Sequence, residues 1–404
     1  MIAENQVYDY LKNLQEQVPS ELTQLCAEFP SLYERKLWHQ LTESSLLFIN
    51  NPASSPFRIS FYKNFVVDWE KHMNKIKLVS FSLAAAKMFK VSHPPPSPTL
   101  LLSFLIDLKE ADEFMGQISE KVNSEETKEA YILSKLEQAH FKLVLNDIDS
   151  AQLILKEADQ VLLKLNKIEP IVYAGYYRVS ADFYKVKANF GQYYKNALLL
   201  LSCIKLDDLT LDEKLERTRD LAIAALLSES IYNFGDLLSH PIINVLAESS
   251  QNWMFELLSA FNNGDISKLD QLTPKFQEQP LLLQHLPFLH QKIRLMALVE
   301  AAFKRQGSSN ENDQLMTFEK LAFETKLPVG DIEHLVMNAL SLGLVDGKID
   351  EIERTIDFTW VQPRYLDKKQ IESMCSRLES WSHRATTVAD GMDSYIANSF
   401  SLAE

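Results

Sequence analysis

Late in the chain, two stretches of helical hydrophobic periodicity follow one another closely. Apolar residues recur at steps of three and four over residues 315–322 and again over residues 332–342, which predicts two amphipathic helices. Pro328 and Gly330 separate the two stretches, and Gly343 follows the second. We therefore expect a turn between the helices and the end of the second helix at Gly343.

The pattern then changes to the alternation of half-buried strands. Residues 348–352 and 355–361 alternate apolar and polar side chains. The dipeptide Asp346-Gly347 precedes the first of these stretches, and this dipeptide favours tight hairpin turns, so we expect a turn there. Two helices joined by a turn and followed by a hairpin predict a winged helix.

The last part of the chain carries the sharpest periodicity. Its apolar residues alternate steps of three and four, which is the seam of a coiled coil. An isolated helix of this kind is marginal in water, and docking on a globular body usually requires a wider apolar stripe, so we expect helices of other chains to cover this one. The seam consists of Ile371, Met374, Leu378, Trp381, Ala385, Val388, Met392 and Tyr395.

The remainder of the chain predicts a mainly α protein. Pro30 is expected to break an early helix. Pro94–Pro98 is expected to form a linker, either a stiff surface loop or a polyproline ligand. Helices that end at polar or glycine pivots then repeat at irregular spacing, which favours a degenerate, right-handed, tetratricopeptide-like solenoid of helical hairpins. The predicted parts are N-terminal helical repeats (1–98), the solenoid (99–305), the winged helix (314–366) and a C-terminal bundle helix (367–404).

Charge narrows the range of partners. The formal net charge is −14, and nine acidic residues against four basic ones lie between Leu315 and Pro363. The second helix of the predicted winged helix contains no Lys or Arg, and binding to nucleic acid depends mainly on cationic contacts with phosphate. No apolar run approaches the ~18 residues of a membrane span. We therefore expect neither nucleic acid nor a membrane as a partner.

No pattern of residues indicates catalysis or the binding of a cofactor or metal. The chain has no nucleotide-binding glycine loop, no His-x-His zinc pattern and no nucleophile elbow, so we expect no enzyme activity, no cofactor and no metal site. Trp69, Trp253 and Trp360 are interpreted as core anchors. The three cysteines are far apart and indicate reduced thiols, as in a protein of the cytoplasm and nucleus.

Residues 318–344 followed by residues 356–364 resemble the PCI module, which is shared by subunits of the proteasome lid, the signalosome and a translation initiation factor complex. Three local strings, Trp360 to Arg364, Tyr232 to Leu238 and His240 to Ile242, are similar to the single-PCI, non-catalytic lid subunits of the 26S proteasome. This resemblance implies a scaffold that holds other PCI subunits and supports ATP-dependent degradation of ubiquitinated proteins.

The expected interface has two parts. We expect the wing to contact a neighbouring chain through Val345, Lys348, Ile349 and Ile352, because an exposed strand edge readily accepts another chain. The seam residues are expected to enter the helical bundle of the lid in a hetero-oligomer. Two alternatives stay open: a scaffold of the signalosome or of the initiation factor, and a nucleic-acid-associated PCI protein.

Overall fold

The computed structural model describes residues 4–86, 98–124, 127–165, 168–206, 209–249, 251–306, 315–363 and 368–401. The chain forms two compact units, residues 1–208 and residues 209–404. Of the predicted Pro94–Pro98 linker only Pro98, the first residue of a helix, lies within the described residues.

The first unit begins with short helices around an aromatic core. Phe29, Phe61 and Phe65 are fully buried, and the ring centroid of Phe29 lies 5.5 Å from that of Phe61 and 5.9 Å from that of Phe65. Pro30 was expected to break its helix, but the helix continues to Glu34. Phe29, next to Pro30, is fully buried, so packing of this turn in the core offsets the cost of the proline. The elements are α1 (Glu4–Gln17), α2 (Ser20–Glu34), α3 (Trp38–Asn50), η1 (Pro52–Phe57), α4 (Arg58–Phe61), η2 (Tyr62–Val66), α5 (Val67–Trp69), η3 (Glu70–His72) and α6 (Lys75–Ala86).

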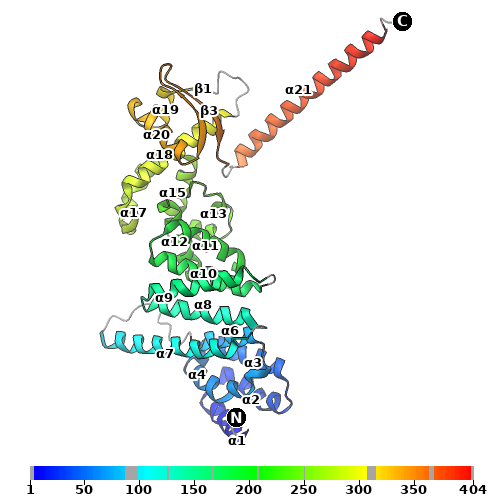
Figure 1. Ribbon diagram of the computed structural model, residues 1–404, viewed down its shortest axis with the longest axis vertical. Helices are drawn as coiled ribbons and strands as arrows, with labels where there is room; N and C mark the ends of the chain where they lie inside the picture. Colours follow the sequence, from blue (N-terminus) through cyan, green and yellow to red (C-terminus); the bar gives the residue numbers. More distant parts are fainter. Residues whose placement is uncertain are drawn as a thin grey trace. The chain divides into compact units, whose positions relative to one another are not determined.

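Longer helices stack as antiparallel layers in the rest of this unit (Figure 1), which confirms the predicted helical repeats. Each α8–α9 and α10–α11 hairpin turns at a residue with positive φ that is followed by an Asx cap, and α15–α16 of the second unit repeats this device. The turn pairs are Asn146–Asp147, Ala188–Asn189 and Gly264–Asp265. The helices are α7 (Pro98–Val122), α8 (Lys128–Val144), α9 (Ile148–Leu162), α10 (Pro170–Val186) and α11 (Phe190–Cys203).

The second unit is built around one long helix, α18. Between Lys292 and Ala302 every side chain of this helix except that of Arg294 is buried, as in a helix covered on all sides. Shorter helices pack on α18, and so does the winged helix. The helical elements before the winged helix are α12 (Leu211–Leu227), α13 (Gly235–Ser239), α14 (Ile243–Glu248), α15 (Asn252–Asn263), α16 (Ile266–Leu272), η7 (Thr273–Glu278), α17 (Pro280–Gln284) and α18 (Leu286–Gln306).

Lys292 ties α18 to the end of α12. Its side chain is 1% exposed, and its Nζ atom donates to the carbonyl oxygens of Ala225 at 2.8 Å, Leu226 at 3.2 Å and Ser228 at 2.6 Å. The last carbonyls of a helix have no partner within that helix and carry its negative dipole end. The three N–H donors of one ammonium group therefore satisfy the C-terminus of α12.

Aromatic rings enclose the rest of this ammonium group. The Nζ atom lies 5.3 Å from the ring centroid of Tyr232, 5.4 Å from that of Phe234 and 5.9 Å from that of Phe288. These distances are within the range of cation–π attraction. Burial still lowers the pKa of Lys292 to about 7, because desolvation disfavours the charged form.

The winged helix is present as predicted, with one error in its hairpin. Asp346 and Gly347 lie inside a strand rather than in the turn, which falls at residues 351–354. A Cβ atom on Gly347 would lie 2.3 Å from the carbonyl oxygen of Asp357, so glycine is needed there for close approach of the strands. The elements are β1 (Leu315–Thr317), α19 (Phe318–Thr325), α20 (Val329–Ser341), β2 (Val345–Asp350), β3 (Thr355–Val361) and α21 (Lys368–Ser401).

The three strands form one antiparallel sheet in the order β1-β3-β2. The predicted helix end at Gly343 is confirmed: its φ is +65°, and the amide of Leu344 donates to the carbonyl oxygen of Ala339. Leu315, which was expected to belong to the first helix, lies in β1 instead. The core of the winged helix includes Leu298 of α18 and Val336 of α20.

Replacing Lys292 with Met should destabilise this unit. The buried carbonyl oxygens of Ala225, Leu226 and Ser228 lose their donor, so we expect the free energy of unfolding to fall by roughly 1–3 kcal/mol. Chemical denaturation of the isolated chain measures the change. Lys320→Met, at an exposed position of α19, is the matched control and should change the free energy little.

The pH dependence of the same variant has a defined sign. The folded pKa of Lys292 is about 7, whereas lysine in an unfolded chain has a pKa of about 10.4. Between these values the unfolded chain binds more protons, so Lys292 makes the free energy of unfolding rise with pH from about 7 to about 10. Lys292→Met should lose this rise and Lys320→Met should keep it. Identical pH profiles for the parent chain and Lys292→Met would contradict this account of the buried ammonium.

Candidate protein-interaction surfaces

The seam predicted for the C-terminal helix lies on α21, and its described side chains are exposed. Leu378 is 63% exposed and Trp381 is 70% exposed, and Ile371, Met374, Val388 and Met392 are exposed as well. The side chain of Tyr395 lies outside the described residues. A line of large apolar side chains facing solvent is typical of a protein-binding surface.

The helix that carries the seam is long and continuous. It has 34 residues, so its length is about 50 Å. Gly391 does not interrupt it, although glycine lowers helix stability by roughly 1 kcal/mol. A helix with an exposed seam gains little from packing within its own chain, and tertiary packing supplies most of a helix's stability. Helices of other chains that cover the seam would supply it.

The wing exposes a different set of residues from the one expected. Strand β2 is at an edge of the sheet, and Lys348 on it is exposed; Ile352, in the turn after it, is 94% exposed. Val345 is 2% exposed, so it was wrongly assigned to the interface: it lies opposite Val361 in the sheet and packs in the core of the winged helix. Ile349 is only partly exposed and packs against the same core.

Two exposed aromatic side chains were missed as surface features. Trp360 was expected in the core but is 45% exposed, whereas Trp69 and Trp253 are buried as expected. The register of β3 shifts opposite Asp346 and Gly347, so Thr359 is an extra residue and the alternation that would turn Trp360 inward is lost.

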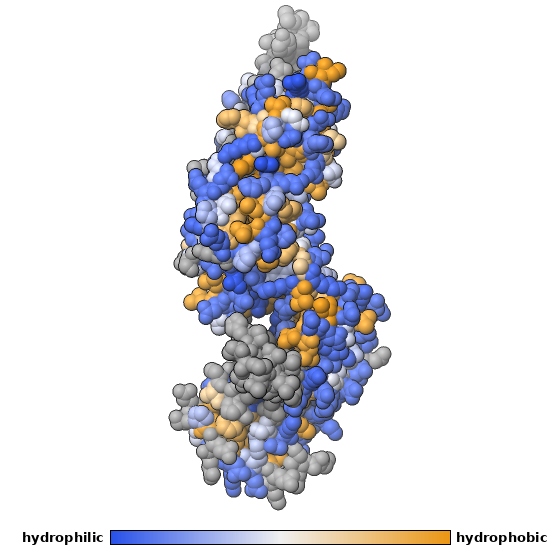
Figure 2. Space-filling view, turned by 90° about the vertical axis from the view of Figure 1, so that its left-hand side faces the viewer, coloured by the Kyte–Doolittle hydropathy of each residue, from blue (hydrophilic) through white to orange (hydrophobic). Residues whose placement is uncertain are grey.

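Phe323 on α19 is 87% exposed. The buried residues of α19 are Phe318, Leu321 and Thr325, and Phe323 lies outside this helical face. Helical periodicity could therefore have identified it as an outward-facing aromatic. Figure 2 shows how apolar side chains interrupt the hydrophilic surface on one face of the molecule.

The described residues offer little for catalysis. No group of three or more His, Cys, Asp or Glu side chains among them could hold a metal ion. Cys26 is buried, and this burial raises the pKa of its thiol to about 11, so the nucleophilic thiolate is scarce at neutral pH. No helix in the described part of the chain is long and apolar enough to cross a membrane.

Comparison with protein families gives two matches that together span most of the chain. Residues 25–258 match the family described as PSD13 N-terminal repeats, and residues 269–360 match the PCI domain. The first match ends within α15 and the second begins within α16, both in the second unit.

Full-length relatives agree with these matches. The Schizosaccharomyces pombe protein named probable 26S proteasome regulatory subunit rpn9 is 35% identical over 95% of this chain and 94% of its own length. The Dictyostelium discoideum protein named 26S proteasome non-ATPase regulatory subunit 13 is 35% identical over 94% of each chain. The translation initiation factor 3 subunit M of Emericella nidulans is 26% identical over only 40% of this chain.

Charge on α20 generates a prediction about nucleic acid. This helix carries Asp331 and Glu333 and no Lys or Arg. The purified chain should therefore give no tight, salt-sensitive shift with mixed RNA or DNA in an electrophoretic mobility assay at low salt. Replacing both acids with Lys should strengthen any residual binding, because it adds phosphate contacts. A tight shift by the unmodified chain, weakened by salt, would instead support a nucleic-acid-associated role.

Proposed function

The chain belongs to the family of the 26S proteasome non-ATPase regulatory subunit 13, and we propose that it is a non-catalytic scaffold subunit of the regulatory particle lid. In this role it holds neighbouring PCI subunits and supports ATP-dependent degradation of ubiquitinated proteins. The observation that carries the proposal is the exposed seam of α21. The chain that carries it matches proteasome regulatory subunits along nearly its whole length.

In this proposal two surfaces of the chain bind other subunits. The seam of α21 enters a bundle with helices of other lid subunits, because burial of about half a dozen large apolar side chains would outweigh the cost of ordering the helix. The edge strand β2, with Lys348 and Ile349, and Ile352 in the turn after it meet a neighbouring chain at the wing. The partners are other PCI-domain subunits and the helical bundle of the lid.

Several finer features follow from the same proposal. The proposed role is non-catalytic, and the name of the relative from Dictyostelium discoideum, a non-ATPase regulatory subunit, supports it. The chain resides in the cytoplasm and nucleus as part of a hetero-oligomer. Its parts are the N-terminal repeats to residue 98, the solenoid to 305, the winged helix over 314–366 and the bundle helix from 367.

A scaffold of another PCI complex is the second candidate. The partial match to subunit M of translation initiation factor 3 is the observation that favours it. That match covers less than half of the chain, whereas the proteasome relatives match along nearly all of it. The two candidates share one mechanism of assembly and differ in the complex that is recovered with the chain.

The test of the proposal is a native pull-down of the tagged full chain followed by mass spectrometry of its partners. The double substitution Leu378→Asp with Trp381→Asp places charge on the seam, so we expect recovery of lid subunits to be lost. The isolated chain should remain folded, with its free energy of unfolding changed by less than about 0.5 kcal/mol, because both side chains face solvent there.

The matched control is Ser380→Asp with Thr387→Asp, on the polar side of the same helix. It introduces the same two aspartates and therefore the same charge, and should leave assembly intact. Full assembly by the seam variant would contradict the proposed role of α21. Recovery of initiation-factor or signalosome subunits by the parent chain would assign the scaffold to another complex.

A further inference from the structure

The charges of α21 are distributed unevenly around its apolar seam. In the heptad register of the seam, Leu378 and Ala385 hold position a, and Trp381 and Val388 hold position d. Positions g and e, which flank such a seam on its two sides, come directly before each a residue and directly after each d residue. Arg384 holds position g, and its side chain is exposed. A cation therefore lies at the edge of the seam.

The flanks of the seam contain no acidic residue. By sequence, Arg377 holds the same heptad position one repeat before Arg384, and Ser382 and Ala389, at position e, are uncharged. The acids of this helix hold positions b and f, away from the flanks: Glu372, Glu379, Asp390 and Asp393. The edge of the seam is therefore basic, although the chain as a whole has a formal net charge of −14.

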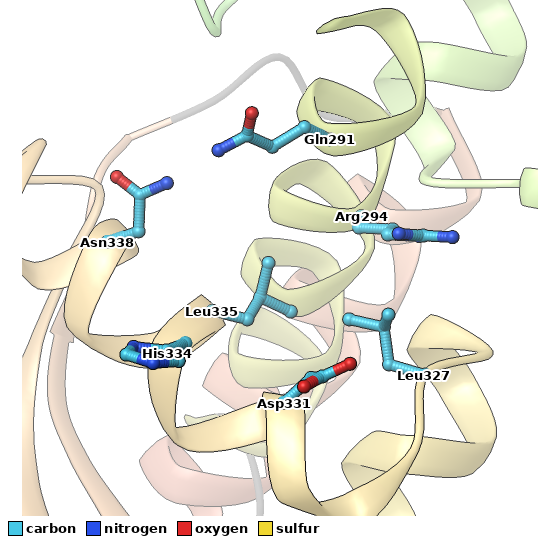
Figure 3. A pocket seen from close by; sticks show the side chains of 7 residues that line it. All are labelled: Gln291, Arg294, Leu327, Asp331, His334, Leu335 and Asn338. Atoms are coloured by element: carbon cyan, nitrogen blue, oxygen red, sulfur yellow. The ribbon is translucent and has the colours of Figure 1, made fainter. Parts of the chain in front are cut away.

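The groove between α18 and α20 shows no comparable preference (Figure 3). Its volume is about 440 Å³, and its lining includes both Arg294 and Asp331, so its charge favours neither an anion nor a cation. Leu335, which also lines it, is buried in the core of the winged helix. The flank of the seam is the surface whose charge specifies a partner.

A second copy of α21 would fit this seam poorly. In a parallel pair equivalent a positions meet, so Ala385 would face another alanine and leave a gap, and Arg384 would face the uncharged Ala389. In an antiparallel pair the two g flanks face each other, so the arginines of the two copies would repel. Unpaired and like charges at such positions select against a partner. The seam therefore favours a helix of different sequence.

We propose that the helix that covers the seam belongs to a neighbouring subunit and carries an acidic residue opposite Arg384 and a large apolar residue opposite Ala385. The carboxylate pairs with the guanidinium group at the edge of the seam, where such pairs set the choice of partner. The large side chain fills the space beside the alanine, as close packing of the bundle requires. The proposal rests on the proposed function and adds the chemistry of the partner helix to it.

Competition between full-length chains tests the charge. A tagged variant and the untagged parent chain are co-expressed, and mass spectrometry of the purified particle measures the share of each that is incorporated. Arg384→Glu turns attraction into repulsion, so its share should fall about five-fold, equivalent to roughly 1 kcal/mol of binding free energy. The matched control is Ser376→Glu with His383→Glu, which changes the net charge equally at exposed f positions. It should be incorporated like the parent chain.

The same competition tests the fit at Ala385. Ala385→Phe should be incorporated at least about five-fold less than the parent chain, because a large side chain of the partner already fills this space. Better incorporation of Ala385→Phe would show that the space is empty and would contradict this part of the proposal. Thermal unfolding of each isolated variant should match that of the parent chain, because the replaced side chains are exposed.

Photo-crosslinking in the assembled particle identifies the partner helix. The photoreactive residue p-benzoylphenylalanine replaces Gly391, at position g one heptad after Arg384. A Cβ atom there would meet no other segment of the described chain within 4 Å. We expect this probe to capture a helix of one neighbouring subunit with Asp or Glu about seven residues from the crosslink, and a probe at His383 not to capture it. Replacing that acid with Arg should restore the incorporation of Arg384→Glu.

Three results would overturn the proposal: equal incorporation of Arg384→Glu and the parent chain, a crosslink from position 391 to a second copy of this chain, or a captured helix without an acid at the expected spacing. Recovery of lid subunits is measured in the same samples. A parent chain that recovers no lid subunits refutes the proposed function itself. A parent chain that assembles, with Arg384→Glu incorporated equally well, refutes the acidic partner alone.

Discussion

The second unit depends on the burial of α18 on all sides. Helices before it and the winged helix after it share this one helix, so its middle is largely apolar. Lys292 is a buried cation in this stretch, and it is tolerated because its ammonium group closes the C-terminus of α12 and lies against three aromatic rings. One buried cation thereby sets how α18 meets α12, and a change there would reach the winged helix through the same helix.

The surfaces proposed for assembly are ones that this core leaves exposed. The apolar side chains of α18 and of the inner face of α20 are buried within the unit, so they cannot serve a partner. The described seam of α21, the wing tip at Ile352 and the exposed ring of Phe323 face solvent instead. A scaffold needs this division, because its body must be stable before its partners arrive while its contact surfaces gain their stability from them.

Much of the fold follows from periodicity, since helical spacing located the winged helix and the seam, and Gly343 marked a helix end. Prediction failed at residues whose conformation or burial is set by contacts with other segments of the chain. Gly347 is needed because the backbone of β3 comes close, Trp360 turns outward because β3 has an extra residue, and Val345 is buried by its partner across the sheet. The role of Lys292 could not be predicted from the sequence either, because its acceptors are backbone carbonyls at the end of a helix more than sixty residues earlier.

The central claim, that α21 is completed by helices of other chains, is tested most directly by amide hydrogen exchange over residues 368–401. The exchange is measured in the free chain and in the assembled particle. The account predicts fast exchange in the free chain, because an isolated helix is marginal in water, and strong protection in the particle. Strong protection already present in the free chain would show that the helix is stabilised within its own chain, and would contradict the account.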